Sequence, residues 1–401
     1  MRRMRGDKEE GERLNGGDSL VKLLRLVASL MIFVGGVVIG LASSSHVTRY
    51  FTSQADIFYT NRGSGSGGYS YYTSEENCSV IQMIVSCPKE DCWSMESFLG
   101  PKNLTHGMSD KELLWRASLV PYQQGYPYPR VPKVAFMFLT RGPLPMLPLW
   151  EKFFKGHEKL FSIYVHAPSG FKLNVTNSSV FLNRVIPSKA VQWGLSTLTD
   201  AEKRLLANAL LDFSNEQFIL LSESCIPIYN FPTVYKYLIN SAHSFVESYD
   251  DPSRYGRGRY SRSMFPDIKL KHWRKGSQWF EMNRAVAIYV ISDTKYYNIF
   301  RKYCRPSCYP DEHYIPTFLN MFHGSLNANR SITWVDWSLG GPHPALHGAS
   351  NITEGFMQSI RNNGTCSYNS EKTSICHLFA RKFAPSALEP LLNISSKVMR
   401  F

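Results

Sequence analysis

The pattern of apolar and polar positions along the chain changes at about residue 131. Beyond that point, short uninterrupted apolar runs alternate with segments whose apolar residues recur at helical spacing. Uninterrupted runs are typical of strands buried on both faces, so the alternation predicts a mostly parallel sheet with helices on both faces. Strands are predicted at 134–140, 161–166, 218–221 and 244–248, and helices at 147–154, at 199–213 behind a capping box (Thr199 to Glu202), and from Asn230 to Ile239. The sequence therefore predicts an α/β domain at 131–401.

An apolar segment of another kind precedes this domain. Residues 26–45 carry no charge, and a helix of that length, at about 1.5 Å per residue, covers about 30 Å, the thickness of a bilayer's hydrocarbon core. Seven basic residues precede the segment, and the next one after it is Arg49. The positive-inside rule then predicts a cytosolic tail at 1–25, one transmembrane helix at 26–45 and a lumenal location for the rest. The alternative is a cleaved signal peptide ending near Ala42, although its apolar core would exceed the usual length of about 7–15 residues.

Residues 46–130 have mixed composition and are predicted to form a lumenal stem. The segment 63–70 is rich in glycine and serine, which is typical of a flexible linker. Ser109 to Glu112 matches a capping box and predicts a short amphipathic helix ending near Leu119. The proline-rich segment 121–132 then ends regular structure. Because the stem holds three cysteines, we expect part of it to pack against the domain that follows.

Sequons and cysteines both favour a lumenal location. Eight Asn-x-Ser/Thr sequons are present where chance predicts about three, and all follow the apolar segment: Asn77, Asn103, Asn174, Asn177, Asn329, Asn351, Asn363 and Asn393. All eight cysteines follow it too, and an oxidising lumen permits disulfides. Zinc is the competing interpretation for Cys304 and Cys308, but no second Cys/His pair stands at zinc-finger spacing. N-glycosylation and disulfide bonds are therefore predicted.

The net charge of +13 is compatible with nucleic acid, anionic lipid or phosphate-bearing ligands. Between Arg254 and Lys275 the chain holds eight basic residues and one acid, Asp267, as nucleic-acid-binding segments often do. A lumenal domain does not meet nucleic acid, so no nucleic-acid partner is expected. The remaining interpretations of this run are a phosphate or acidic-glycan surface and a solvated face.

Polar residues follow three of the predicted strands, at 140–143, 166–169 and 222–227, where the ligands of parallel sheets gather. A membrane-anchored lumenal α/β domain suggests enzymes that build glycans from nucleotide sugars, many of which hold the diphosphate through a divalent metal on Asp-x-Asp. This chain has no Asp-x-Asp, and Glu223 is the one carboxylate at the end of the third strand. Cationic side chains would then take the phosphate charge, so we expect no metal site and no other cofactor.

Several motifs follow one another in order from residue 134 to the C-terminus. They are the strand 134–140, Ile163-Tyr-Val-His-Ala167, Phe218-Ile-Leu-Leu-Ser-Glu-Ser-Cys-Ile-Pro-Ile228, Lys275-Gly-Ser-Gln-Trp-Phe280, Tyr309-Pro-Asp-Glu-His313, Trp334-Val-Asp-Trp-Ser338 with His343-Pro, and Leu378-Phe-Ala-Arg-Lys-Phe383. Together they resemble glycosyltransferase family 14, the core-2/I-branching β-1,6-N-acetylglucosaminyltransferases, and most of all its plant branch. The resemblance implies a GT-A-type fold, a UDP-sugar donor, inversion at the anomeric carbon and no metal.

The resemblance also implies roles for residues of the donor site. Glu312 matches the family's catalytic base, which takes the proton of the attacking hydroxyl. Pro310 can hold a turn or helix start there, whose dipole attracts negative charge. Lys382 matches the lysine that binds the donor diphosphate, with Arg361 as its expected partner and Arg381 as a competitor for the role. The alternatives are that Glu312 is a solvent-facing acid at a helix start and that Lys382 is a surface lysine.

On the acceptor side, Trp337 matches a tryptophan that contacts the acceptor, because the C–H face of a sugar stacks well on an indole ring. The alternative for Trp337 is a place in the core. Glu247 resembles an acceptor-binding carboxylate of the family. The segment 275–279 combines small residues with an aromatic one and is expected to line the donor or acceptor cleft, because small residues let the backbone approach a ligand.

Two other signals are discounted. His343 and His347 have the i, i+4 spacing of zinc ligands, but Pro344 disfavours a helix between them and no glutamate follows His343. Cys225 follows the third strand, where some relatives carry an acid, and we expect it to be buried or disulfide-bonded rather than a nucleophile.

The resulting hypothesis is a single-pass type II enzyme of the Golgi membrane, held in the bilayer by one helix, with a lumenal catalytic domain. It would transfer a sugar, with N-acetylglucosamine as the first candidate, from a UDP-sugar to a hydroxyl of a glycan or glycoprotein acceptor. Two alternatives stay open. One is transfer of glucuronic acid or xylose onto cell-wall or proteoglycan glycans, and the other is a catalytically silent glycan-binding protein on the same fold.

Overall fold

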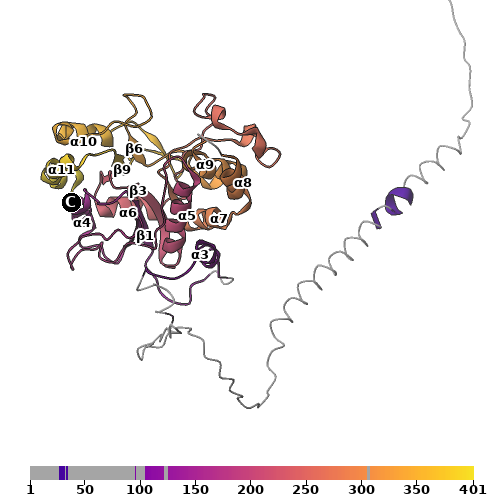
Figure 1. Ribbon diagram of the computed structural model, residues 1–401, viewed down its shortest axis with the longest axis horizontal. Helices are drawn as coiled ribbons and strands as arrows, with labels where there is room; N and C mark the ends of the chain where they lie inside the picture. Colours follow the sequence, from indigo (N-terminus) through magenta and orange to yellow (C-terminus); the bar gives the residue numbers. More distant parts are fainter. Residues whose placement is uncertain (1–26, 32, 35–94, 96–103, 122–124, 305–307) are drawn as a thin grey trace, which may run out of the picture. The chain divides into compact units, whose positions relative to one another are not determined.

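The computed structural model describes residues 27–31, 33–34, 95, 104–121, 125–304 and 308–401 (Figure 1). The predicted cytosolic tail, much of the predicted transmembrane segment and most of the stem lie outside these residues, as do Cys78, Cys87, Cys92, Asn77 and Asn103. Among the described residues, no helix combines the length and the apolar character needed to cross a membrane. The chain divides into two compact units, Met1–Ile84 and Val85–Phe401, and every described strand belongs to the second.

A four-stranded sheet forms the centre of the second unit. In spatial order its strands are β2 (Phe161–His166), β1 (Lys133–Leu139), β3 (Asn215–Ser222) and β5 (Glu281–Asn283). β1 pairs in parallel with β2 and β3, which confirms three predicted strands, and β5 pairs antiparallel with β3. Leu139, His166 and Ser222 lie in register across the sheet. The parallel strands therefore deliver their following loops to one edge of the sheet.

Helices cover both faces of this sheet, as the alternating pattern predicts (Figure 1). Along β1, Ala135 and Met137 belong to one core, whereas Phe136 and Phe138 belong to the other. The first core is closed by α3 (Asp110–Ala117), α5 (Ser196–Leu210), α7 (Arg284–Ser292), α8 (Lys295–Tyr303) and α9 (Pro310–Phe322). The second is closed by α4 (Leu147–Phe154), α6 (Phe231–Ile239), α10 (Glu354–Arg361) and α11 (Leu388–Ile394). The chain is thus an α/β domain with a largely parallel sheet.

Two of the local predictions are wrong. Thr199 and Glu202 do not form a capping box, because α5 begins three residues earlier at Ser196 and both side chains are buried inside the helix. Tertiary burial overrides the local capping signal at this position. The segment 244–248 forms isolated bridges, such as Phe245 to Glu281, rather than a strand. By contrast, Asn230 caps α6 as predicted, with its Oδ1 accepting the N–H of Thr233 at 3.1 Å.

A smaller sheet stands next to the end of β3. β9 (Phe379–Arg381) pairs antiparallel with β4 (Ile226–Pro227) and in parallel with β6 (Thr333–Val335). β4 follows β3 after three residues, so this pairing brings the last sequence motif beside the carboxyl end of β3. A separate hairpin consists of β7 (Cys366–Tyr368) and β8 (Glu371–Thr373).

Two disulfides join described cysteines, Cys304 to Cys308 and Cys366 to Cys376. The first pair is therefore a disulfide rather than half of a zinc site. Cys225 is free and buried, as expected, and burial raises the pKa of its thiol. Its sulfur accepts the N–H of Ser222 at 3.2 Å, which places it behind the end of β3 rather than in a nucleophile's position.

The helix α3, which the sequence assigns to the stem, packs as part of this unit. Its predicted capping box is confirmed, since the N–H of Glu112 donates to Ser109 Oγ at 3.3 Å and the N–H of Ser109 donates to the Glu112 carboxylate at 2.8 Å. Leu113, which is 1% exposed, and Ala117 lie in the first core. In Figure 1, α3 lies beside α5 and α7, which it contacts. This part of the stem therefore contributes to the stability of the domain.

Leu113→Ala is expected to lower the free energy of unfolding by about 2–5 kcal/mol, because it leaves a cavity between α3 and the core. Denaturant unfolding of the two proteins measures the difference. Leu119→Ala is the matched control, since Leu119 follows the same helix and is 53% exposed. An effect at Leu113 no larger than that at Leu119 would contradict the packing of α3.

Candidate active site

The carboxyl-terminal edge of the sheet opens into a cleft of about 1300 Å³. Its walls come from segments that are far apart in the chain. Four of them lie at strand ends: 139–141 at the end of β1, 166–169 at the end of β2, Ser222 and Glu223 at the end of β3, and Arg381 with Lys382 at the end of β9. The others are 275–279, the start of α9 and the strand β6 at 333–335. Four of the five donor- and acceptor-site residues expected from the resemblance line this cleft, namely Glu312, Lys382, Trp337 and Glu247. The parallel sheet and the sequence motifs thus converge on one place.

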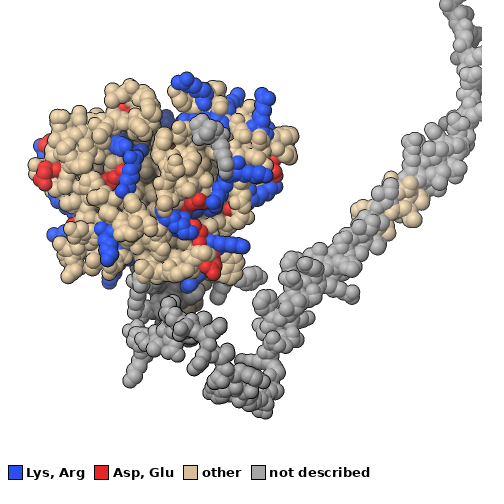
Figure 2. Space-filling view, viewed as in Figure 1, with Lys and Arg blue, Asp and Glu red and all other residues tan. Residues whose placement is uncertain are grey.

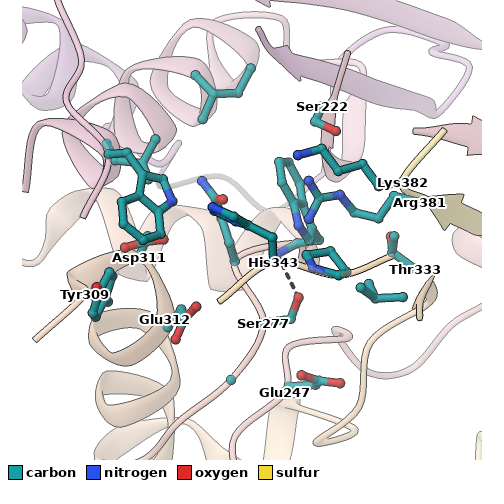
Figure 3. A pocket seen from close by; sticks show the side chains of 18 of the residues that line it. Ser222, Glu247, Ser277, Tyr309, Asp311, Glu312, Thr333, His343, Arg381 and Lys382 are labelled. Atoms are coloured by element: carbon teal, nitrogen blue, oxygen red, sulfur yellow. Dashed lines mark hydrogen bonds between the residues drawn. The ribbon is translucent and has the colours of Figure 1, made fainter. Parts of the chain in front are cut away.

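Glu312 lies in the first turn of α9 and faces the cleft (Figure 3). Tyr309, with a φ of 52°, turns the chain into the helix, and Pro310 begins it. The Glu312 Oε2 accepts a hydrogen bond from Arg259 at 2.7 Å and lies 3.2 Å from the Lys275 ammonium. With 28% of the side chain exposed, Glu312 is not a freely solvated acid. Two cations and the positive end of a helix hold this carboxylate at the cleft surface, where a general base would be needed.

A second acid, Asp311, is buried beside Glu312. It is 7% exposed, and among the described residues its Oδ1 has no hydrogen-bond partner. Burial and the neighbouring charge of Glu312 raise the pKa of Asp311 to about 7. Glu202 of α5 is fully buried, and burial, together with the charge of Asp311, raises its pKa well above the usual value. Glu202 accepts a hydrogen bond from Gln278 at 2.9 Å, and this bond ties a cleft-lining segment to α5.

Lys382 and Arg381 lie together at one end of the cleft (Figure 3), and Arg141, whose charge acts on Lys382, adds to the positive charge there. Burial and the charges of Arg381 and Arg141 lower the pKa of Lys382, and burial lowers the pKa of Arg381. Glu223 partly offsets this charge, but within 104–121, 125–304 and 308–401 no ion pair joins any of the three cations to an acid. Such incompletely balanced positive charge favours the binding of a polyanion such as a diphosphate.

Arg361 does not join this group. It ends α10, its guanidinium lies 4.2 Å from the centre of the Tyr229 ring, and it donates a hydrogen bond to the Val398 carbonyl. Those contacts hold it against the C-terminal segment, and Arg361 is not among the residues that line the cleft. Arg381, the competitor named from the sequence, lines the cleft next to Lys382 instead. Its guanidinium stacks 4.2 Å from the centre of the Trp279 ring.

Trp337 and Glu247 supply groups that suit a sugar acceptor. Trp337 is 53% exposed, so it is not a core tryptophan, and its indole is free to stack. The neighbouring Asp336 accepts the N–H of Ser338 at 2.9 Å, which orders the loop. Glu247 is half-buried, and burial raises the pKa of its carboxyl against the opposing effect of Lys275. An exposed ring and a hydrogen-bonding carboxyl thus occur in the same cleft.

The segment 275–279 lines the cleft throughout, as predicted. Gly276 is needed there for a different reason from the expected one. Its N–H donates to the Glu312 carbonyl at 2.8 Å, and a Cβ atom at this position would overlap the carbonyl of Glu247. Glycine therefore lets the segment 275–279 pass close to the backbone at Glu247.

Sequence reasoning missed several cleft residues. Arg259 belongs to a basic run whose exposed members, Arg254, Arg257, Arg262, Lys269 and Lys271, lie on the surface; Figure 2 shows basic side chains gathered at the upper right of the molecule. Nothing in the sequence separates Arg259, which binds Glu312, from Arg257, which binds Asp250 at 2.6 Å. Trp193 also lines the cleft, with its ring centroid 5.1 Å from that of Tyr309, and it is an isolated aromatic in the sequence. Of these three residues, only Arg141 could have been expected at the cleft from the sequence, because it follows the first predicted strand.

The six sequon asparagines among the described residues are all exposed, and Asn363 also lines the cleft: Asn174, Asn177, Asn329, Asn351, Asn363 and Asn393. Exposure is the condition that N-glycosylation requires. Where the structure describes the chain, no three His, Cys, Asp or Glu side chains gather as metal ligands. His347, one of the discounted histidines, has its Nε2 3.5 Å from an Asp336 oxygen.

Asp311→Asn is expected to stabilise the protein more at pH 8 than at pH 5, by several degrees in melting temperature. A carboxyl with a pKa of about 7 in the folded chain and about 3.8 in the unfolded chain binds more protons when folded, so its contribution to stability falls as the pH rises through that window. Asparagine removes this titration. Melting curves from pH 5 to pH 8 check the effect, with Asp267→Asn at an exposed acid as the control. A difference in melting temperature between Asp311→Asn and the wild type that stays constant from pH 5 to pH 8 would contradict this prediction.

Comparisons with known proteins identify the family of this chain. The sequence model of the core-2/I-branching enzyme family matches residues 134–361, which include Glu312, Trp337 and Glu247. A rice protein (Oryza sativa subsp. japonica), glycosyltransferase BC10, is 36% identical over 309 residues, which cover 66% of this chain and 76% of the rice protein. The resemblance found in the sequence motifs is thereby confirmed, including its plant character. The chain belongs to the core-2/I-branching family of glycosyltransferases.

Proposed function

We propose that this glycosyltransferase transfers a sugar from a UDP-sugar to a hydroxyl of a glycan or glycoprotein acceptor, with inversion and without a divalent metal. N-acetylglucosamine is the proposed donor sugar, and glucuronic acid and xylose are its competitors. The proposal rests on one observation: a cluster of incompletely balanced cations and a paired carboxylate line the same cleft. Lys382 and Arg381 belong to the first group, and Glu312 is the second.

The two groups suit opposite ends of a displacement reaction. As the acceptor oxygen bonds to the anomeric carbon, Glu312 takes the hydroxyl proton. The bond from the anomeric carbon to the diphosphate oxygen breaks, and UDP departs with the electron pair. Lys382, Arg381 and Arg141 then stabilise the negative charge that develops on the leaving diphosphate, the role that a divalent metal plays elsewhere.

The residues around Glu312 orient it for this role. Arg259 and Lys275 bind its Oε2, and the Gly276 N–H binds its carbonyl oxygen. Trp337 offers a face for the acceptor ring, and Glu247 offers an acceptor for its hydroxyl hydrogens. The side chain and the backbone of Glu312 are thus both held in place before substrate arrives, which limits reorganisation during the reaction.

We also propose that residues 26–45 anchor the chain in the Golgi membrane as a single-pass type II protein, with the catalytic domain in the lumen. The uncharged segment and the basic residues before it support this topology. The exposed sequons and the two disulfides suit an oxidising compartment in which proteins are glycosylated.

Glu312→Gln is expected to lower kcat for sugar transfer by about 10²–10⁴-fold, because glutamine keeps the shape but cannot accept the proton. The assay uses full-length protein and whichever sugar of a UDP-sugar panel the wild type transfers fastest. Glu354→Gln is the control, since Glu354 is also paired with a lysine, at 2.7 Å, but lies outside the cleft. Undiminished transfer by Glu312→Gln would remove Glu312 from the role of base.

Lys382→Ala is expected to weaken UDP binding about ten- to a hundredfold, the value of one charge-assisted hydrogen bond. Calorimetric titration with UDP in the presence of EDTA measures this, and wild-type affinity and transfer should be unaffected by EDTA. Lys397→Ala, at an exposed lysine outside the cleft, is the matched control. Complete loss of wild-type transfer in EDTA would overturn the proposal that side chains replace the metal.

A further inference from the structure

The carboxylate of Asp110 lies outside the segment matched by the family model and is connected to the cleft by the buried side chains of Arg204 and His166. Asp110 is the first residue of α3, whereas the family match begins at residue 134. Both of its oxygens bind Arg204 of α5, with the Arg204 Nε donating to Oδ1 and Nη2 donating to Oδ2, each at 2.8 Å. The Arg204 side chain is only 5% exposed. This is a bidentate pair in which the arginine is almost completely removed from water.

The third contact of the Arg204 guanidinium continues the chain to the cleft. Its Nη1 lies 2.8 Å from the Nε2 of His166, and His166 ends β2 and lines the cleft. Arginine can only donate, so the His166 Nε2 accepts and the proton of the neutral ring is on Nδ1. Burial and the charge of Arg204 lower the pKa of His166 to about 4, which keeps the ring neutral at neutral pH.

Asp110 also binds a cation that lines the cleft directly. The Lys189 ammonium donates to Asp110 Oδ2 at 2.8 Å, and the Lys189 N–H points to the same His166 Nε2 at 3.5 Å. Lys189 and Trp193 belong to the segment between β2 and α5 that forms one wall of the cleft, and Trp193 packs against Tyr309. Arg204 and Lys189 together hold the pKa of Asp110 far below its usual value.

The charges make Asp110 necessary for this arrangement. In the residues that the structure describes, Asp110 is the acid that pairs with Arg204, and His166 is neutral. Without Asp110, a buried guanidinium would lose its counter-charge, a change that strongly disfavours the arrangement around it. Arg204 and Lys189 contact His166, and Lys189 belongs to the wall at 189–193. If Arg204 moved, His166 at the end of β2 and this wall would therefore move as well. The end of β2 is next to the end of β1, and Arg141, which follows β1, belongs to the positive end of the cleft.

We propose that Asp110 is a positioning residue for the nucleotide sugar: by holding Arg204 and Lys189 it orients His166, which lies next to the donor end of the cleft, and the wall at 189–193. The stem helix α3 is then part of the active site's support, although it lies outside the segment that defines the family. The proposal rests on the proposed function, because it takes the positive end of the cleft as the place of the UDP group.

The test compares Asp110→Asn with Glu112→Gln in the full-length chain. Both substitutions neutralise an acid of α3, but Glu112 bonds to Ser109 within its own capping box. Asp110→Asn is expected to raise KM for the UDP-sugar and the dissociation constant for UDP about tenfold, with kcat changed much less. Hydrogen exchange should become faster at 187–195. Asp110→Glu should restore most of the UDP affinity, and Glu112→Gln should match the wild type.

A merely structural role for Asp110 would instead lower the melting temperature and the active fraction, which reduces kcat and leaves KM and UDP affinity unchanged. That result overturns the proposal. If Asp110→Asn does not fold, Lys189→Met tests the same wall at a side chain that is 59% exposed, and unchanged UDP affinity in that variant counts against the proposal. If the wild type binds no UDP, the proposed function fails, and exchange at 187–195 alone decides whether Asp110 orders the wall.

Discussion

Incompletely balanced positive charge at one end of the cleft is the constraint on which the site depends. Arg141, Arg381 and Lys382 are brought together by strands that are distant in sequence, and among the residues that the structure describes Glu223 is the acid that offsets them in part. Like charges held together while partly buried are unfavourable unless a counter-charge arrives. The large apolar cores on both faces of the sheet supply the stability that tolerates this arrangement. An anionic ligand then gains from relieving the repulsion as well as from its own contacts.

The opposite end of the cleft has the reverse arrangement of charge. Glu312 is matched by Arg259 and Lys275, and the acids behind it, Asp311 and Glu202, are buried where burial favours their protonated forms. The raised pKa values of the two buried acids distinguish them from Glu312, which is paired with cations at the cleft surface. The cleft therefore has incompletely balanced cations at one end and a carboxylate paired with two cations at the other.

The helix α3, which lies outside the segment matched by the family model, is linked to the cleft through Asp110. Its apolar face fills the first core through Leu113, while its first residue, Asp110, compensates Arg204 beneath the cleft. A single short helix thus adds both packing and charge balance. This helix, which the sequence alone assigns to a stem, is consequently part of the folded domain.

The sequence by itself determined the α/β class, the positions of three parallel strands, the cap of α6 and the capping box of α3. These follow from local patterns: continuous apolar runs and capping side chains. Of the five residues that the family resemblance assigns to the donor and acceptor sites, four line the cleft. Only the tertiary structure decided that Arg381 and not Arg361 accompanies Lys382, and that Arg259 turns toward Glu312 while Arg257 turns toward Asp250. It also decided that Thr199 and Glu202 are buried inside α5. Such choices depend on which segments meet in space and which charges are left unpaired there, and no local pattern of residues records either.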